Sequence, residues 1–146
     1  MTSLAPVLDG KVLIAEDDPE MRAMLRALFL NAGIEVDLVA DGTQLQDRLF
    51  DGHAWLPEVL VSDVEMPGAS GLAVLQRLQE CDADVRVVLI TALGEARTHR
   101  RAHRLGAVAV LDKPFDIRVL LDVVSRLLDE SRSSDHRPTE EDLATD

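Results

Sequence analysis

VLVSDVEMPG, residues 59–68, joins an apolar run to a single carboxylate, Asp63, and then to a Met-Pro-Gly turn. The run predicts a buried strand, because almost continuous apolar residues are typical of strands that are covered on both faces. A carboxylate at the end of such a strand is costly to bury unless a positive group pairs with it. Asp63 is therefore either an ordinary loop acid or a residue that meets a cation.

Similar apolar runs recur along the chain, and each is followed by a helical pattern. The predicted strands are residues 11–15, 35–40, 58–62, 86–91 and 107–111. Asp37 interrupts the second run, which predicts an edge strand with one face toward solvent. Strand and helix alternate five times, so the sequence predicts an α/β fold: a doubly wound, five-stranded parallel sheet with helices on both faces.

The segments between the runs have helical periodicity. Pro19 suits the first turn of a helix whose apolar stripe includes Met21 and Met24, which we expect in the core, and Gly33 suits its C-terminal cap. A second clear stripe follows Asp116, a predicted N-cap, and reaches residue 128. Weaker helical patterns cover residues 43–50, 72–80 and 95–105.

The composition fits one domain of ordinary size. The chain has 146 residues, of which 47% are hydrophobic, so it can bury a core. We expect an N-terminal extension over residues 1–10, a folded domain over residues 11–130 and a disordered polar tail over residues 131–146. Acidic residues outnumber basic ones 27 to 15, and the net charge of −12 argues against direct nucleic-acid binding.

The sequence also predicts the compartment. Its N-terminus lacks the basic and apolar regions of a signal peptide, and no apolar run approaches the length of a membrane span. Cys81 is the single cysteine, so an internal disulfide cannot form. These features predict a cytoplasmic protein that does not insert into a membrane.

Polar residues follow four of the predicted strands at their carboxyl ends. If the strand order is 2-1-3-4-5, neighbouring strands direct Glu16, Asp17, Asp63, Thr91 and Lys113 toward one place. Oxygen ligands without histidine or cysteine suit a hard cation such as Mg²⁺. An Asp63 oxygen would remain free as a nucleophile toward phosphorus, and the ammonium and hydroxyl groups would contact phosphoryl oxygens.

These residues lie in motifs that resemble the receiver domain of bacterial two-component response regulators. The motifs are VLIAEDDPEMR, LVSDVEMPGASGL, VVLITA and LDKPF, in the family's order and at its usual intervals. The resemblance covers roughly residues 11–128. It implies a flavodoxin-like (βα)5 fold and a stand-alone response regulator, which is a signalling switch that catalyses only its own phosphorylation and dephosphorylation.

The resemblance implies a role for each acid of the predicted site. Asp63 is the phosphoryl acceptor, and the donor is a histidine kinase or a phosphotransfer protein. Glu16 and Asp17 form the acid pair that binds Mg²⁺, or Mn²⁺ in its place, with Asp17 as the direct ligand and Glu16 acting through water. Glu65 completes the coordination with its backbone carbonyl, while Asp18 lies just outside the site.

The resemblance also implies how a phosphoryl group is sensed. Thr91 is the switch hydroxyl, and Lys113 is the cation that contacts phosphate and precedes a cis bond to Pro114. Val110 stands where receiver domains usually place Tyr or Phe. This departure puts aromatic gating in doubt and leaves signalling to the segment after Thr91 and the helix that follows it.

Residues 95–105 (EARTHRRAHRL) form the one strongly basic segment of this acidic chain. In receiver domains the fourth helix, fifth strand and fifth helix commonly form the output face, so the resemblance implies a surface for an acidic protein partner or a second copy. The alternative is an ordinary solvated helix face, which most charge runs are. The arginines of the segment are Arg97, Arg100, Arg101 and Arg104.

Two other classes of function can be compared with this interpretation. An aspartate-based phosphohydrolase carries a second acid two residues after its nucleophile, and Glu65 has that spacing, but the Met-Pro-Gly turn and LDKPF argue against this class. A flavin- or nucleotide-binding domain needs a Gly- or Ser/Thr-rich loop after the first strand, where this chain has AEDDPEM. Turnover of a small phosphomonoester would identify the hydrolase.

Overall fold

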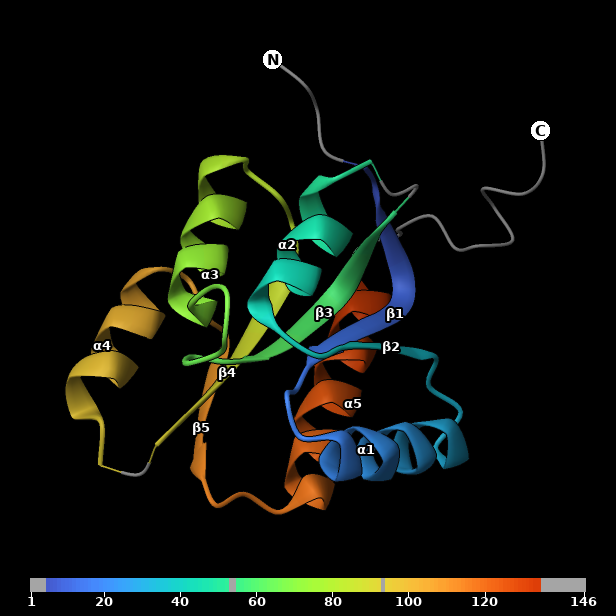
Figure 1. Ribbon diagram of the computed structural model, residues 1–146. Helices are drawn as coiled ribbons and strands as arrows, with labels where there is room; N and C mark the ends of the chain where they lie inside the picture. The colour runs from blue at the N-terminus through green and yellow to red at the C-terminus, as the bar shows by residue number, and fades with distance from the viewer. Residues whose placement is uncertain (1–4, 53–54, 93, 135–146) are drawn as a thin grey trace.

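The computed structural model describes residues 5–52, 55–92 and 94–134, and it confirms the predicted α/β class (Figure 1). Within these ranges all the strands are parallel and lie in one sheet of order β2-β1-β3-β4-β5, as the sequence predicts. The elements alternate in the order β1 (Val7–Ala15), α1 (Pro19–Asn31), β2 (Val36–Val39), α2 (Gly42–Phe50), β3 (Leu56–Asp63), α3 (Gly71–Glu80), β4 (Arg86–Ala92), α4 (Ala96–Arg104), β5 (Ala109–Lys113) and α5 (Ile117–Ser134).

Helices cover both faces of the sheet. Helices α1 and α5 pack on one face around Phe29 and Leu120, and helices α2, α3 and α4 pack on the other face around Leu45 and Leu75 (Figure 1). Strand β3 lies at the centre and is buried along its whole length, which explains its nearly continuous apolar sequence. Strand β2 lies at an edge, and Asp37 is exposed there as predicted.

Three details differ from the sequence-based expectation. Strand β1 begins at Val7, inside the expected N-terminal extension, and α5 continues to Ser134, beyond the expected boundary at residue 130. The division into extension, domain and tail stays a prediction, because residues 1–4 and 135–146 lie outside the described residues. Met24 is 51% exposed rather than part of the core, because the buried face of α1 runs through Leu25 and Phe29.

The length and hydrophobicity of the described helices can be compared with those of a membrane span. None of them combines the length and the hydrophobicity that a membrane span requires.

Candidate functional site

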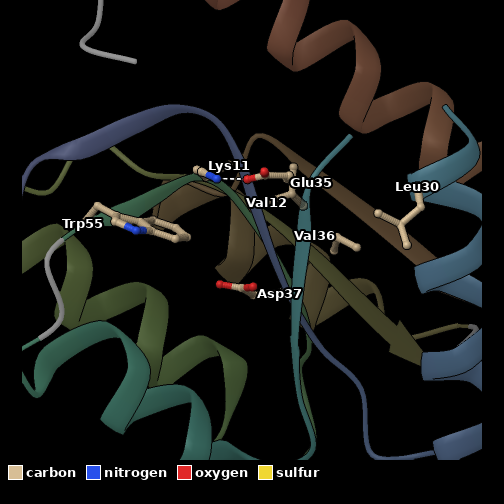
Figure 2. A pocket seen from close by; sticks show the side chains of 7 residues that line it. All are labelled: Lys11, Val12, Leu30, Glu35, Val36, Asp37 and Trp55. Carbon is tan, nitrogen blue, oxygen red and sulfur yellow. Dashed lines mark ion pairs between the residues drawn. The ribbon is translucent and has the colours of Figure 1, made fainter. Parts of the chain in front are cut away.

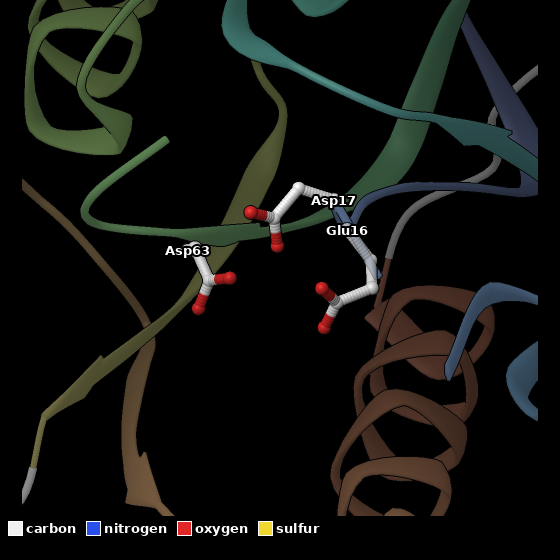
Figure 3. A group of neighbouring side chains, drawn as sticks. All are labelled: Glu16, Asp17 and Asp63. Atoms are coloured by element: carbon white, nitrogen blue, oxygen red, sulfur yellow. The ribbon is translucent and has the colours of Figure 1, made fainter. Parts of the chain in front are cut away.

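The carboxyl ends of β1, β3, β4 and β5 meet at one edge of the sheet and bring the predicted site residues together. Glu16 and Asp17 follow β1, Asp63 ends β3, Thr91 is the second-last residue of β4, and Lys113 ends β5. Carboxylate oxygens of the three acids all lie within 4.8 Å of one another. Figure 3 shows these carboxylates turned toward the same space.

Asp63 is buried and has one neighbouring countercharge. Its side chain is 4% exposed, and the Lys113 ammonium lies 3.0 Å from each of its two carboxylate oxygens. Burial raises the pKa of Asp63, although the hydrogen bond and charge of Lys113 act in the opposite direction. Burial would lower the pKa of Lys113, but the hydrogen bond and charge of Asp63 outweigh it and raise that pKa. The ammonium therefore stays charged at neutral pH.

Glu16 adds a second buried carboxylate to the cluster. Burial raises the pKa of Glu16, and the nearby acids Asp17 and Asp63 raise it further, against a backbone hydrogen bond from Asp18 that lowers it. Three acids thus face one ammonium, which leaves an excess of negative charge at the end of the sheet. An all-oxygen donor set with such an excess fits a hard divalent cation, and the residues present are therefore suited to Mg²⁺.

The loop between β1 and α1 orients Glu16. Asp18 lies outside the cluster of the described acids and caps α1, because its side chain accepts a hydrogen bond of 3.0 Å from the Glu20 amide. The Asp18 amide donates to Glu16 Oε2 at 3.0 Å, and Arg22 Nη1 donates to the Glu16 backbone carbonyl at 2.8 Å. Sequence reasoning missed Arg22. No signal in the sequence pointed to this contact, because Arg22 reaches back six residues from α1 to the backbone of the loop.

The backbone after Asp63 is fixed by close packing against α3 and β4. The Val64 amide donates to the Ile90 carbonyl, and the Gly71 amide donates to the Val64 carbonyl, each at 2.8 Å. Ser62 Oγ donates to the Asp63 carbonyl at 2.9 Å. A Cβ at Gly71 would collide with the Asp63 carbonyl oxygen, so only glycine lets α3 begin this close to the end of β3.

A pocket of about 230 Å³ opens beside Asp63. Glu65, Thr91 and Lys113 line it, so the acceptor candidate, the hydroxyl and the cation share one space. Thr91 is buried, whereas Glu65 is exposed and stands outside the group of three acids found among the described residues. The structure therefore places Glu65 at the pocket but not in the carboxylate cluster.

A second pocket, of about 460 Å³, is also lined by Lys113 and includes Glu16 and Asp17. Its lining continues into an apolar rim formed by Met21, Pro114 and Phe115. The Lys113–Pro114 peptide bond is cis, as the resemblance implied. Asp63 therefore lines one pocket and Glu16 and Asp17 line another, and Lys113 lines both.

Helix α4 contributes residues to the site that sequence reasoning did not identify. Glu95 and Thr98, at its N-terminal end, line the same pocket as Asp63. His99 Nε2 lies 2.6 Å from Asp112 Oδ1 on β5. No sequence signal pointed to these contacts, because they depend on how α4 packs against the sheet.

A third pocket, of about 110 Å³, lies beside the edge strand β2 and contains none of the clustered acids (Figure 2). Its charged lining is already paired: Lys11 forms an ion pair with Glu35, and Arg48 lies 3.6 Å from Asp37. The Arg48 guanidinium also stacks over the Trp55 ring, 4.2 Å from its centroid. We therefore interpret this region as structural.

Comparisons with known proteins identify the family of the chain. A family model described as the response regulator receiver domain matches residues 12–125. The C4-dicarboxylate transport transcriptional regulatory protein of Pseudomonas aeruginosa is 41% identical over 133 residues, covering 90% of this chain. Sporulation initiation phosphotransferase F of Bacillus subtilis is 30% identical over 122 residues, covering 84% of this chain and 96% of that protein.

Solved structures show the same similarity. The receiver domain of a Francisella response regulator has a TM-score of 0.75 and 25% identity, covering 84% of this chain and 99% of that one. The chemotaxis response regulator CheY4 of Vibrio cholerae has a TM-score of 0.68 and 26% identity, covering 82% of this chain and 98% of that one. Among the curated relatives, this chain spans 28% of the length of the Pseudomonas regulator.

Proposed function

The chain belongs to the response regulator receiver domain family, and we propose that it is a phospho-accepting switch whose acceptor is Asp63. One observation carries the assignment of the residue. Asp63 is the buried carboxylate that contacts the Lys113 ammonium and lies within 4.8 Å of two further carboxylates at the carboxyl edge of the sheet. No other acid of the described chain combines these features.

The proposed donor is a phosphohistidine on a histidine kinase or on a phosphotransfer protein. An Asp63 oxygen attacks phosphorus, and the phosphorus–nitrogen bond to the imidazole breaks as the phosphorus–oxygen bond forms. Lys113, 3.0 Å from both Asp63 oxygens, neutralises charge on the transferred group, and the Thr91 hydroxyl donates a hydrogen bond to it. Positioning and charge neutralisation of this kind are most of what phosphoryl transfer requires.

The proposal includes a metal site made by the acid cluster. Asp17 would bind Mg²⁺ or Mn²⁺ directly, Glu16 through water, and Asp63 and the Glu65 carbonyl would complete the protein ligands. When bound, the ion supplies positive charge that offsets repulsion between the acids and the incoming phosphoryl group. The all-oxygen donor set supports this part of the proposal.

The proposed output is a protein contact rather than a catalysed reaction on a substrate. The contact face is α4, β5 and α5, in a folded domain that we place at residues 11–130. Its partner is an acidic protein or a second copy of the chain, because a basic patch attracts such a surface. We place this activity in the cytoplasm, where histidine kinases have access to ATP. The exposed arginines of α4, called the basic surface below, are Arg97, Arg100, Arg101 and Arg104.

Intact mass spectrometry after incubation with acetyl phosphate tests the proposal. We expect one phosphoryl adduct on the wild-type chain in the presence of Mg²⁺, and none without Mg²⁺ or on Asp63→Asn. Labelling of Asp63→Asn at another residue would overturn the assignment of the acceptor. Multiple turnover of a small phosphomonoester would instead identify an aspartate-based hydrolase.

A further inference from the structure

Helix α4 is held to the domain by little apolar packing. Of its residues, all of which the structure describes, only Ala102 is buried. Its N-cap residue, Glu95, makes no side-chain hydrogen bond to the helix. Helices in proteins are stabilised mainly by burial of an apolar face, so the position of α4 depends strongly on individual polar contacts.

His99 provides such a contact from the middle of α4. Its Nε2 atom lies 2.6 Å from Asp112 Oδ1, and the two side chains are 30% and 39% exposed. A hydrogen bond to a carboxylate that is partly removed from water is stronger than one between neutral groups. The contact therefore ties α4 to the end of β5.

Asp112 lies beside both residues that are proposed to sense a phosphoryl group. It immediately precedes Lys113 on β5, and in the sheet it is paired with Thr91 of β4. On the helix side, Thr98 precedes His99 and lines the pocket that contains Asp63. The contact between His99 and Asp112 thus spans from the edge of the pocket to the strand that carries Lys113.

Val110, which replaces the usual aromatic residue, explains why a polar contact between α4 and β5 would be useful in this chain. Residues 110 and 112 lie on the same face of β5, because side chains alternate along a strand, and Val110 packs in the core cluster that contains Ala102 of α4. Valine is stiff at χ1 and has no ring that could turn between two positions. A polar contact that opens and closes can link the sheet to α4 where no aromatic ring does so.

We propose that His99 and Asp112 form a latch, which holds α4 against β5 in the unphosphorylated domain and opens on phosphorylation of Asp63. The latch rests on the proposed function. A phosphoryl group enters the pocket between Lys113 and Thr98, next to the latch, and changes the relative position of β5 and α4. His99 and Asp112 are positioning residues, since neither lines that pocket. Opening of the latch lets α4, which carries the basic surface, shift to fit its partner.

Hydrogen exchange of residues 96–104, measured by mass spectrometry on the whole chain, tests whether the latch holds α4. We expect His99→Ala to speed this exchange roughly fivefold or more, the lower end of ordinary coupling between sites. His103→Ala is the matched control, because His103 is an exposed histidine one turn further along the same helix. Equal exchange in the two variants would overturn the latch.

Binding of beryllofluoride with Mg²⁺, a mimic of the aspartyl phosphate, tests the coupling. A latch that favours the unphosphorylated state opposes binding of the mimic, so His99→Ala should bind it roughly fivefold or more tightly than wild type. Asp112→Ala, which removes the acceptor oxygen, should act in the same direction. Its combination with His99→Ala should add nothing further, since both remove one interaction. His99→Gln, whose amide nitrogen can reach Asp112, should return toward wild type.

The outcomes separate the latch from the proposed function. A wild-type chain that binds no beryllofluoride would contradict the proposed function and, with it, the coupling. Normal binding with equal affinities for His99→Ala and His103→Ala would contradict the latch alone. Additive effects of the two latch variants would also contradict it, because they would then act through separate contacts.

Discussion

At Asp63, the proposed phosphoryl acceptor, burial costs stability. Burial raises the pKa of Asp63 in the folded chain above its ordinary value of 3.8, so the folded state holds the proton more tightly than the unfolded state. The loss of stability that comes from ionising the buried Asp63 is absent at pH values below 3.8. It grows as the pH rises through the raised pKa of the folded state, and it is complete above that pKa. The ionised carboxylate is therefore a liability at neutral pH.

We predict that Asp63→Asn stabilises the domain at pH 7 in the absence of Mg²⁺. The gain arises because asparagine carries no charge, so the free-energy cost of burying the ionised carboxylate is removed. Urea unfolding of both proteins at several pH values measures it, and the difference should shrink as the pH falls toward 4. A variant less stable than wild type at pH 7 would show that the Lys113 contact outweighs the cost of burial.

Asp17 is the acid of the cluster that solvent reaches, and it should dominate metal binding. We predict that Mg²⁺ raises the melting temperature of the wild-type chain, since an ion that binds only the folded state stabilises it by about 2.7 kcal/mol at 100 times its Kd. Asp17→Asn should lose most of this response. Asp18→Asn is the control, because Asp18 lies outside the cluster of the described acids and asparagine still caps a helix. Equal responses of the two variants would contradict the metal site.

At the scale of elements, the start of α3 sets the position of the acceptor strand. A Cβ at Gly71 would collide with the Asp63 carbonyl oxygen, so Gly71→Ala must push α3 away from β3. We predict a loss of about 1–3 kcal/mol in the free energy of unfolding, the usual cost of overpacking, together with slower phosphorylation of Asp63.

Gly33→Ala is the comparison for this variant, and urea unfolding is the measurement. Nothing lies within 4 Å of an added Cβ at Gly33, and its φ of +77° makes the cost purely one of backbone conformation. Gly33→Ala should therefore destabilise the domain without slowing phosphorylation. Slowing of both variants to the same extent would show that lost stability, rather than the position of Asp63, limits the reaction.

The elements differ in how well the sequence predicts them. Strand β3 was predictable because a central parallel strand must be apolar on both faces, and Asp37 marked β2 as an edge strand for the opposite reason. Met24 was placed wrongly in the core. Helical spacing alone is compatible with two adjacent apolar faces on α1, one through Met24 and one through Leu25. Packing against β2 and α5 buries the face through Leu25.

The site was predictable where single residues end strands, and it was not where helices meet strands. Glu16, Asp63 and Lys113 each follow an apolar run, so parallel strands necessarily bring them to one edge. The contact between His99 and Asp112 depends on the rotation of α4 over β5. That rotation has no local signal in a helix with one buried residue.

At the scale of the whole molecule, the net charge is −12, and α4 is the most strongly basic of the described helices. Charges at the surface act over about 8–10 Å at moderate salt, so the basic surface can attract an anion although the chain as a whole repels it. We predict that the wild-type chain binds poly-glutamate at low ionic strength and releases it near 1 M salt, where the screening length falls to about 3 Å.

The double variant Arg100→Gln/Arg101→Gln tests whether this binding resides on α4. It should lose most of the affinity for poly-glutamate, whereas Arg26→Gln/Arg77→Gln changes the net charge equally, at exposed positions on α1 and α3 outside the proposed contact face, and should retain it. Neither variant should alter acetyl phosphate labelling, because none of these arginines lines the pocket beside Asp63. Equal loss in both variants would mean that net charge alone governs the binding, and the basic surface would then have no special role. Stronger poly-glutamate binding by His99→Ala than by His103→Ala would further show that the latch restrains the same surface that meets the acidic partner.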